Sequence, residues 1–150
     1  MSRIMALDVG EKTIGVAFSD ETGTRAFPAT TIVRQEGKKR DMAALRQLVA
    51  ENEVKEIVVG LPLMLDGTRG IQAEKVEEFI KVLRNNVRIP ITTQDERLST
   101  SEAERVLIAA DRRREERKRT VDSMAACLIL QTYLDRRRNL KEQSEDEETA

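Results

Sequence analysis

Short apolar runs in the first third of the chain predict β-strands. The run "RIMALDVG" (3–10) has the composition of a buried strand, and "KTIGVAFSD" (12–20) alternates large apolar with small residues. After the turn "ETG", the segment "TRAFPATTIV" (24–33) continues the pattern. Three strands in such quick succession predict an antiparallel meander, and Pro28 indicates that the third strand lies at or near an edge.

The period of the pattern changes in the middle of the chain. Residues 38–52 and 71–85 carry apolar residues at helical spacing, whereas "EIVVGLP" (56–62) and "IPITTQDE" (89–96) are short apolar strands. The segment "MLDGTRG" (64–70) is expected to be a loop. A meander joined to such β–α units predicts an α/β fold with a mixed sheet covered by helices.

The last third of the chain is expected to be helical. Ser99 precedes Glu102 by three residues, which is a capping box, and predicts a helix over "STSEAERVLIAA" (99–110). A final helix is predicted over 120–138. We expect residues 1–138 to form one domain without repeats, and residues 139–150 to form an acidic, disordered tail.

The composition indicates a soluble protein of a reducing compartment. The chain of 150 residues is 39% apolar and 35% charged, and no apolar stretch reaches the roughly 20 residues that a membrane span needs. A single cysteine, Cys127, cannot form an internal disulfide bond. The N-terminus enters a strand pattern without a signal-like leader. We therefore expect a cytoplasmic protein.

Charge is unevenly distributed along the chain. The whole chain has a net charge of −1, but its tail (139–150) carries −4, which leaves +3 on residues 1–138. The segment "DRRREERKR" (111–119) holds six basic and three acidic residues. Such a cluster suits a polyanionic partner, although it can also be a solvated loop and a frayed helix end.

Missing residue types exclude several kinds of chemistry. The chain has no histidine, which rules out Ser-His-Asp and Cys-His catalysis, histidine-based zinc sites and a histidine general base. It has no tryptophan, three phenylalanines and one tyrosine, too few aromatic residues for a protein that stacks successive bases of a single strand. An enzyme of this composition works with carboxylates, amines, hydroxyls or a hard metal.

Acidic residues stand at the ends of three predicted elements. Asp8 ends the first strand, Asp95 and Glu96 end the last strand, and Asp122 begins the final helix. Clustered carboxylates repel one another unless a cation compensates them, and Mg²⁺ or Mn²⁺ prefers such oxygen ligands. Two such ions suit an in-line phosphoryl displacement. At helical spacing, Asp122 shares a face with Ala125, Ala126, Ile129 and Tyr133.

Each of these acids also has an ordinary structural explanation. Asp8 is followed by Val9 and Gly10, which is a common strand-to-turn sequence. Asp122 suits the positive end of a helix dipole. Asp95 and Glu96 precede Arg97, with which they can form a surface ion pair. From spacing alone, both explanations stay open.

Four motifs in this order resemble the YqgF family of RNase H-like proteins, candidate pre-16S rRNA nucleases and candidate Holliday junction resolvases. They are "ALDVGEKTIGVAFSD", "IVVGLPLMLDG", "DERLST" followed by "SEAERVL", and "VDSMAACLILQTYL". The resemblance covers residues 4 to about 137. It implies an RNase H-like fold, with a mixed five-stranded sheet (an antiparallel meander plus two parallel strands) and helices on both faces.

The resemblance also implies the roles of individual residues. Asp8, Glu96 and Asp122 become the catalytic acids that bind Mg²⁺ or Mn²⁺, with two ions expected, and Asp95 is the alternate to Glu96. The chain has "KTIG" where the family usually has "RIG", which puts one phosphate contact in doubt. The expected nucleic-acid contacts are Lys12, Arg97, Arg112, Arg113, Arg114, Arg117, Lys118 and Arg119.

The implied activity is metal-dependent hydrolysis of phosphodiester bonds in structured nucleic acid. Precursor ribosomal RNA is the first candidate substrate, with processing at the 5′ end of pre-16S rRNA, and a four-way DNA junction is the second. A non-catalytic module that binds RNA or the ribosome is the alternative from another class. The segment "DVGEKTIGVAFSD" also resembles the first phosphate loop of actin-like ATPases and sugar kinases, but 150 residues leave no room for their second half. The oligomeric state is left open.

Overall fold

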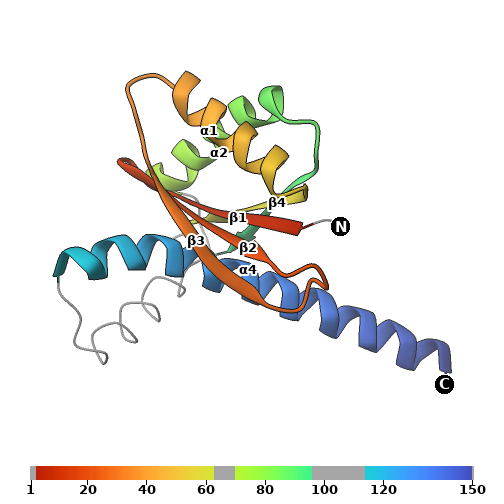
Figure 1. Ribbon diagram of the computed structural model, residues 1–150. Coiled ribbons are helices and arrows are strands. Elements are labelled where there is room, and N and C mark those ends of the chain that lie inside the picture. The colour runs from red at the N-terminus through yellow and green to blue at the C-terminus, as the bar shows by residue number, and fades with distance from the viewer. Residues whose placement is uncertain (1–2, 63–69, 96–113, 150) are drawn as a thin grey trace.

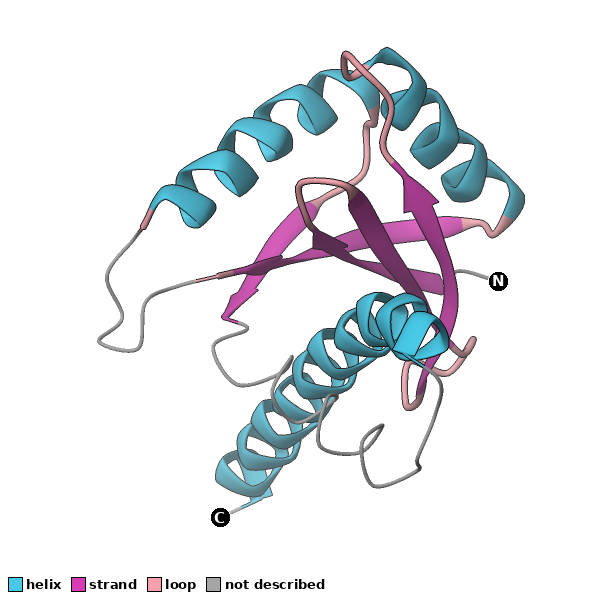
Figure 2. Cartoon of the chain, turned by 90° about the vertical axis from the view of Figure 1, so that its left-hand side faces the viewer, coloured by secondary structure: helices cyan, strands magenta, loops and turns pink. Residues whose placement is uncertain are grey.

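The computed structural model describes residues 3–62, 70–95 and 114–149, and within the last range the side chains of residues 123–141. These residues form a five-stranded sheet with the order β3-β2-β1-β4-β5 and helices on both faces (Figure 1). Helices α1 and α2 lie on one face, and α4 crosses the other (Figure 2). The elements are β1 (Arg3–Val9), β2 (Thr13–Ser19), β3 (Ala26–Val33), α1 (Lys39–Glu51), β4 (Val54–Leu61), α2 (Ile71–Asn86), β5 (Ile91–Asp95) and α4 (Arg114–Thr149).

The pairing of the strands confirms the predicted mixed sheet. Strands β1, β2 and β3 pair antiparallel as a meander, whereas β4 pairs parallel with both β1 and β5. Strand β3 is an edge strand, as Pro28 predicted, and the register of its pairing with β2 shifts between Val16 and Ala17, where Pro28 faces Ala17. Since proline cannot donate a ladder hydrogen bond, an edge with a register shift tolerates it best.

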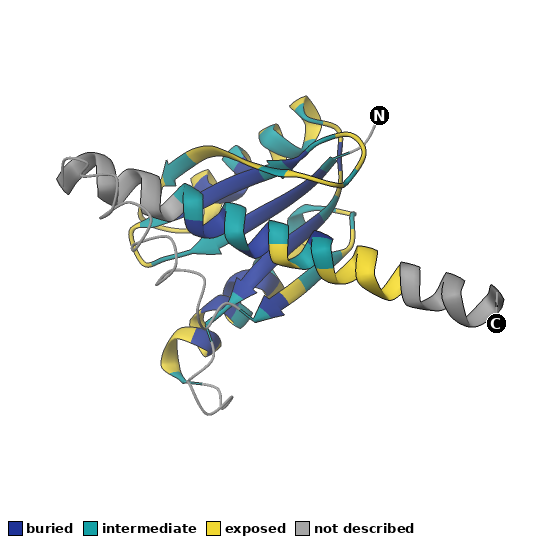
Figure 3. Ribbon diagram, turned by 90° about the horizontal axis from the view of Figure 1, so that it is seen from below, coloured by how far each residue is buried: buried dark blue, intermediate teal, exposed yellow. Residues whose placement is uncertain are grey.

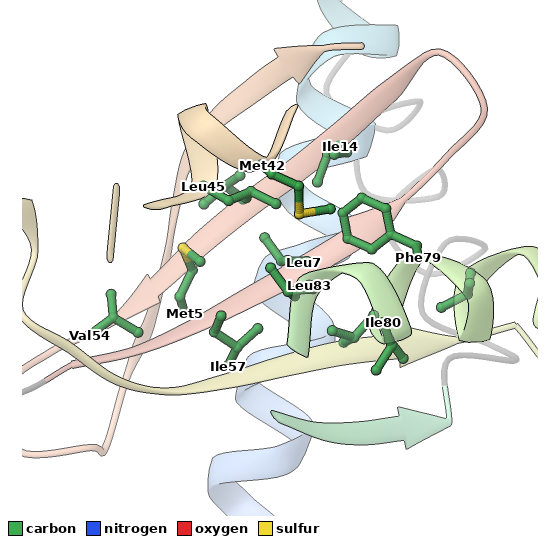
Figure 4. Close-up of a cluster of buried hydrophobic side chains, with 13 residues drawn as sticks. Met5, Leu7, Ile14, Met42, Leu45, Val54, Ile57, Phe79, Ile80 and Leu83 are labelled. Carbon is green, nitrogen blue, oxygen red and sulfur yellow. The ribbon is translucent and has the colours of Figure 1, made fainter. Parts of the chain in front are cut away.

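One core lies between the sheet and the helices α1 and α2. Met5 and Leu7 of β1 point into it, and so do Leu45 of α1 and Phe79 of α2, all fully or almost fully buried (Figure 4). Each large apolar side chain buried in this way stabilises the fold by about 1.5 to 3 kcal/mol. The helical stripes read from the sequence are therefore the faces that pack on the sheet.

A second core lies between the sheet and α4. Ile4 and Ala6 of β1 alternate with Met5 and Leu7 and point to this other face, where they meet Ala126 and Ile129 of α4. Figure 3 shows the middle of α4 lying against the buried strands, while the exposed turns that follow it extend beyond the sheet. The small alanines allow the helix to approach the strands closely.

Helix α4 is longer than predicted, because it begins at Arg114 and extends to Thr149 rather than spanning 120–138. Leu134 is the last buried residue described in it, and residues 136–141 are all exposed. The domain boundary at 138 and the disordered tail stay predictions. The helix predicted over 99–110 and all of the predicted loop except Gly70 lie outside the described residues. In the described ranges, no helix is both long enough and apolar enough to span a bilayer.

Candidate functional site

Asp8 is the last residue but one of β1, a central strand of the sheet. It is half-buried and pairs in register with Gly15 of β2. Because side chains alternate along a strand, Asp8 shares a face with Ile4 and Ala6, which pack against α4. The carboxylate therefore belongs to the α4 side of the sheet, at the edge where the parallel strands β1, β4 and β5 end.

The residues beside Asp8 on the neighbouring strands are glycines. Gly15 is its partner on β2, and Gly60 is the next residue of β4 after the Leu7–Val59 pair. Neither residue carries a side chain that could cover Asp8. The sequences "TIGVAF" and "VVGLP" thus interrupt two apolar strands with glycine at the level of the same carboxylate.

Helix α4, whose backbone includes Asp122, packs on the same face of the sheet as Asp8. Ala125 and Ala126 are fully buried, and α4 packs across all five strands. Asp122 lies one helical turn before these alanines along α4, while its side chain is outside the described residues. The predicted stripe of Asp122, Ala125, Ala126, Ile129 and Tyr133 is therefore confirmed for Ala125, Ala126 and Ile129, which are fully buried, and for Tyr133, which is half-buried.

The two acids predicted at the end of β5 are separated by the pleat of the strand. Asp95 pairs with Leu61, which packs against the core of α1 and α2, so Asp95 lies on the opposite face from Asp8. Gln94 shares the α4 side and is buried. Glu96 lies outside the described residues.

Carboxylates are the right donors for a hard divalent cation. Among the described residues, no group of three or more Asp, Glu, His or Cys side chains is placed to hold a metal ion. Two of the three predicted ligands, the Glu96 and Asp122 side chains, are outside that set. The described part of the site, Asp8 between two glycines on the face that α4 covers, fits the predicted donor set.

A cleft of about 780 Å³ opens beside the turn that follows Asp8. Its charged lining consists of four cations and three acids: Lys12, Arg34, Lys38, Lys75, Glu11, Glu36 and Glu78. Lys75 donates a hydrogen bond of 2.6 Å to Glu11 Oε1, and this bond holds the pKa of Glu11 below its usual value. Lys12, a predicted phosphate contact, is exposed at this turn.

The other predicted phosphate contacts lie partly outside the described residues. Arg97, Arg112 and Arg113 are not described, and Arg114, Arg117, Lys118 and Arg119 are described only as backbone in the first turns of α4. Because α4 begins at Arg114, these four residues are part of the helix rather than of a preceding loop.

Sequence reasoning missed Arg34. Its guanidinium donates to the carbonyl oxygen of Gly10 at 2.7 Å and to Asp41 Oδ2 at 3.1 Å. No local motif marks this residue, which directly follows β3 in the short segment that leads to α1. Only the fold brings Arg34 to the turn that follows Asp8. Its partner in that turn, Gly10, lies 24 residues earlier in the chain.

Curated relatives match most of this chain. A protein of Thermoanaerobacter pseudethanolicus is 52% identical over 138 residues, which cover 91% of this chain and 99% of its own length. Relatives from Desulforamulus reducens and Clostridioides difficile are each 49% identical over 133 residues, covering 89% of this chain and 96% and 94% of their own lengths. Each of the three is named as a candidate pre-16S rRNA nuclease.

Solved structures share the fold. RuvC of T. thermophilus in complex with a Holliday junction substrate superimposes with a TM-score of 0.53 at 13% identity, covering 86% of this chain and 92% of that one. A further T. thermophilus RuvC structure gives a TM-score of 0.51 at 10% identity, with 85% and 92% covered. The RNase H-like fold is thereby confirmed.

A family model described as RuvX, Holliday junction resolvase, matches residues 2–136. The match spans β1 to the buried part of α4, and therefore includes Asp8, Glu96 and Asp122. Together with relatives about half identical over nearly their full length, it confirms the resemblance read from the motifs. The chain belongs to the RuvX (YqgF) family.

Proposed function

We propose that this protein is a divalent-metal-dependent nuclease that hydrolyses phosphodiester bonds in structured nucleic acid, with pre-16S rRNA as its substrate and the 5′ end as the place of processing. The placement of Asp8 carries the proposal. It presents a carboxylate at the carboxyl end of a central strand, flanked by Gly15 and Gly60, on the face that α4 crosses. Membership of a family described by nuclease activity supports the same reaction class.

Asp8, Glu96 and Asp122 would hold two metal ions, either Mg²⁺ or Mn²⁺. When bound, such ions stabilise the negative charge that develops on phosphoryl oxygens. The position of Asp95 on the α1–α2 face favours the next residue, Glu96, as the ligand, since neighbouring residues of a strand point to opposite faces. Asp8 sits on a paired strand rather than on a loop, so its backbone is held before any ligand arrives.

Basic residues would bind the phosphate backbone of the substrate, while the acids would hold the metal ions. Lys12 follows Asp8 by four residues and lines the cleft together with Lys38 and Lys75. Arg97 and the run from Arg112 to Arg119 would extend this contact. Phosphate contacts of this kind position a substrate without reading its sequence, and they weaken as salt rises.

The direct test is a cleavage assay with Mg²⁺ or Mn²⁺ on a labelled pre-16S rRNA fragment. Asp8→Asn and Asp122→Asn remove one candidate ligand charge each and are expected to abolish cleavage. Asp135→Asn is the matched control, because it makes the same change further along α4, where Asp135 contacts Gln131 and Arg138. Cleavage that survives both ligand variants would overturn the proposed site.

A four-way DNA junction is the second candidate substrate, because the family model is described as a Holliday junction resolvase. A resolvase that makes paired cuts needs two copies related by two-fold symmetry, whereas trimming of an RNA end needs one. The same assay therefore includes a labelled junction, and sedimentation is measured with and without each substrate. Symmetric cuts confined to the junction, made by a dimer, would replace rRNA processing as the function.

A non-catalytic module that binds RNA or the ribosome predicts a different result. If the acids had no metal to hold, their mutual repulsion would destabilise the fold. Asp8→Asn and Asp122→Asn would then raise the melting temperature and leave the cellular function intact. For a nuclease we expect loss of function in cells with both variants, whatever their melting temperatures.

A further inference from the structure

Arg34 joins three parts of the protein beside the turn that follows Asp8. Its Nη1 donates to the carbonyl oxygen of Gly10 at 2.7 Å, and its Nε donates to Oδ2 of Asp41 at 3.1 Å. The guanidinium carbon lies 5.3 Å from the ring centroid of Phe79. One planar group thus contacts the β1–β2 turn, the first turn of α1 and the inner face of α2.

The guanidinium is itself held in place. Only 1% of the Asp41 side chain is exposed, against 20% for Arg34. Each charge therefore compensates the other, because a charge buried without its partner would destabilise the fold. Asp41 also accepts a hydrogen bond of 3.3 Å from the backbone of Gln35. Phe79 is buried in the core and supports the face of the guanidinium. A planar fork on a fixed carboxylate and a fixed ring has little freedom to turn away from Gly10.

Residue 34 holds the turn at two points. In addition to the bond from its side chain to Gly10, its backbone N–H donates to the carbonyl oxygen of Lys12 at 2.9 Å. Within the turn, Gly10 N–H donates to Thr13 at 2.8 Å. Gly10 follows Asp8 by two residues, so a rotation of the Gly10 peptide group would be transmitted to the end of β1.

We propose that Arg34 is a positioning residue for the carboxylate of Asp8, acting through the carbonyl group of Gly10. The inference rests on the proposed function, in which Asp8 is a metal ligand. Arg34 does not touch the metal or the substrate in this role. It keeps the end of β1 in the conformation that directs Asp8 toward the α4 side, as outer-shell partners do for ligands elsewhere.

The test measures Mn²⁺ affinity by calorimetry on the full chain. The double variant Arg34→Met/Asp41→Asn removes the bond to Gly10 without leaving a buried charge unpaired. We expect its dissociation constant to rise by about 10-fold, the lower end of the range for partners bonded directly to a ligand, because Arg34 acts through Gly10. Asp41→Asn alone keeps Arg34 and its bond to Gly10 but removes the charge that holds the guanidinium, so its dissociation constant is expected to rise less than that of the double variant.

Two controls separate positioning from general stability. Arg25→Met removes an arginine that lies over Phe27, at the opposite end of the β2–β3 hairpin. Ile80→Val removes one methylene group from the core that contains Phe79, without touching the turn. Neither should change Mn²⁺ affinity. If Ile80→Val weakened binding as much as the double variant, affinity would follow stability alone and the positioning role would be wrong.

The outcomes distinguish this inference from the proposed function. If Asp8→Asn binds Mn²⁺ as tightly as the wild type, Asp8 is no ligand, and both proposals fall. If Asp8→Asn abolishes binding while the double variant binds normally, only the role of Arg34 is overturned. Should the double variant fail to fold, Arg34→Lys decides, because a single ammonium nitrogen does not reproduce the rigid fork in which Nε meets Asp41 and Nη1 meets Gly10. Weaker Mn²⁺ binding supports the role, and unchanged binding overturns it.

Discussion

The hydroxyl of Tyr133 on α4 donates a hydrogen bond of 2.5 Å to Oε1 of Glu56 on β4, a residue 77 positions earlier in the chain. The same carboxylate accepts from Thr92 of β5 at 3.2 Å and lies 3.4 Å from Arg137 of α4. Glu56 is therefore the point at which α4 is tied to two parallel strands of the sheet. Because α4 also carries Asp122, this tie fixes how the helix lies across the face that holds Asp8.

We predict that Tyr133→Phe lowers the free energy of unfolding by about 1 to 2 kcal/mol, because it removes a donor to a charged group. The loss stays moderate since Glu56 keeps its contacts with Thr92 and Arg137. Urea unfolding at neutral pH measures it. Glu56→Gln is the control that retains an acceptor for Tyr133. If Tyr133→Phe equalled or exceeded the wild type in stability, the hydrogen bond would not be what holds α4 in place.

The same contact predicts a loss of stability at alkaline pH. Burial, and then the hydrogen bond to Glu56 and its charge, raise the pKa of Tyr133 above the usual value of about 10. A group whose pKa is raised on folding stabilises the fold below its unfolded pKa, and this contribution disappears as pH rises through the folded pKa. The gap in stability between the wild type and Tyr133→Phe should therefore shrink above about pH 10.

Two measurements check this pH dependence. The chain has one tyrosine and no tryptophan, so phenolate absorbance reports on Tyr133 alone. Its midpoint in the native protein should lie above that in urea. The unfolding free energies of the wild type and of Tyr133→Phe, measured below and above the native midpoint of the phenolate titration, then test whether the difference in stability shrinks. Coincident midpoints in native and unfolded protein would contradict the prediction.

The strands could be predicted because the pattern of their residues leaves few alternatives. The apolar run before Asp8 and the alternating pattern after Lys12 are both typical of strands, and the short turn between them favours antiparallel pairing. Pro28 excludes a central position in the sheet for the third strand. The length of α4 could not be predicted in this way. Its last buried residue among those described is Leu134, and Leu140 further along is exposed. The Arg, Lys, Glu and Gln residues on both sides are good helix formers that leave no pattern of burial.

The candidate site was predictable only where a residue's position in a strand decides its direction. Asp8 follows from the end of β1, and the buried alanines of α4 follow from helical spacing. The choice between Asp95 and Glu96 depends on the register of β5 against β4, which the sequence does not contain. Arg34 depends on a contact between segments that are distant in the chain, for which the sequence offers no local signal.

Gly10→Ala tests how tightly the turn after Asp8 is built. A Cβ atom at Gly10 would lie 3.0 Å from the carbonyl oxygen of Thr13, a main-chain atom that cannot move alone. We predict a loss of about 1 to 3 kcal/mol in unfolding free energy, together with weaker Mn²⁺ binding. Thermal unfolding and calorimetry measure the two effects.

Gly37→Ala is the matched control for that variant. Gly37 has open space around it but a φ of +74°, so alanine there costs about 1 to 2 kcal/mol for a backbone reason alone. It should lose stability without losing affinity for Mn²⁺. If both variants weakened metal binding equally, the conformation of the Gly10 turn would have no particular importance for Asp8.

Removal of residues 139–150 should leave stability unchanged and strengthen binding to nucleic acid. The described side chains beyond Arg138 are exposed, so the truncated chain should unfold within about 0.5 kcal/mol of the full one. Truncation changes the net charge from −1 to +3, because the tail carries −4. Acidic residues at the C-terminal end of α4 interact unfavourably with the negative end of the helix dipole, so their loss does not weaken the helix electrostatically.

Salt dependence separates a charge effect from any other role of the tail. The gain in affinity for a labelled RNA should be largest at low salt and vanish as salt screens the charges. A full-length variant whose five tail acids are replaced by Gln or Asn should behave as the truncated chain does. If truncation instead weakened RNA binding or lowered the melting temperature, the tail would be part of the binding surface or the fold, and the predicted domain boundary at residue 138 would be wrong.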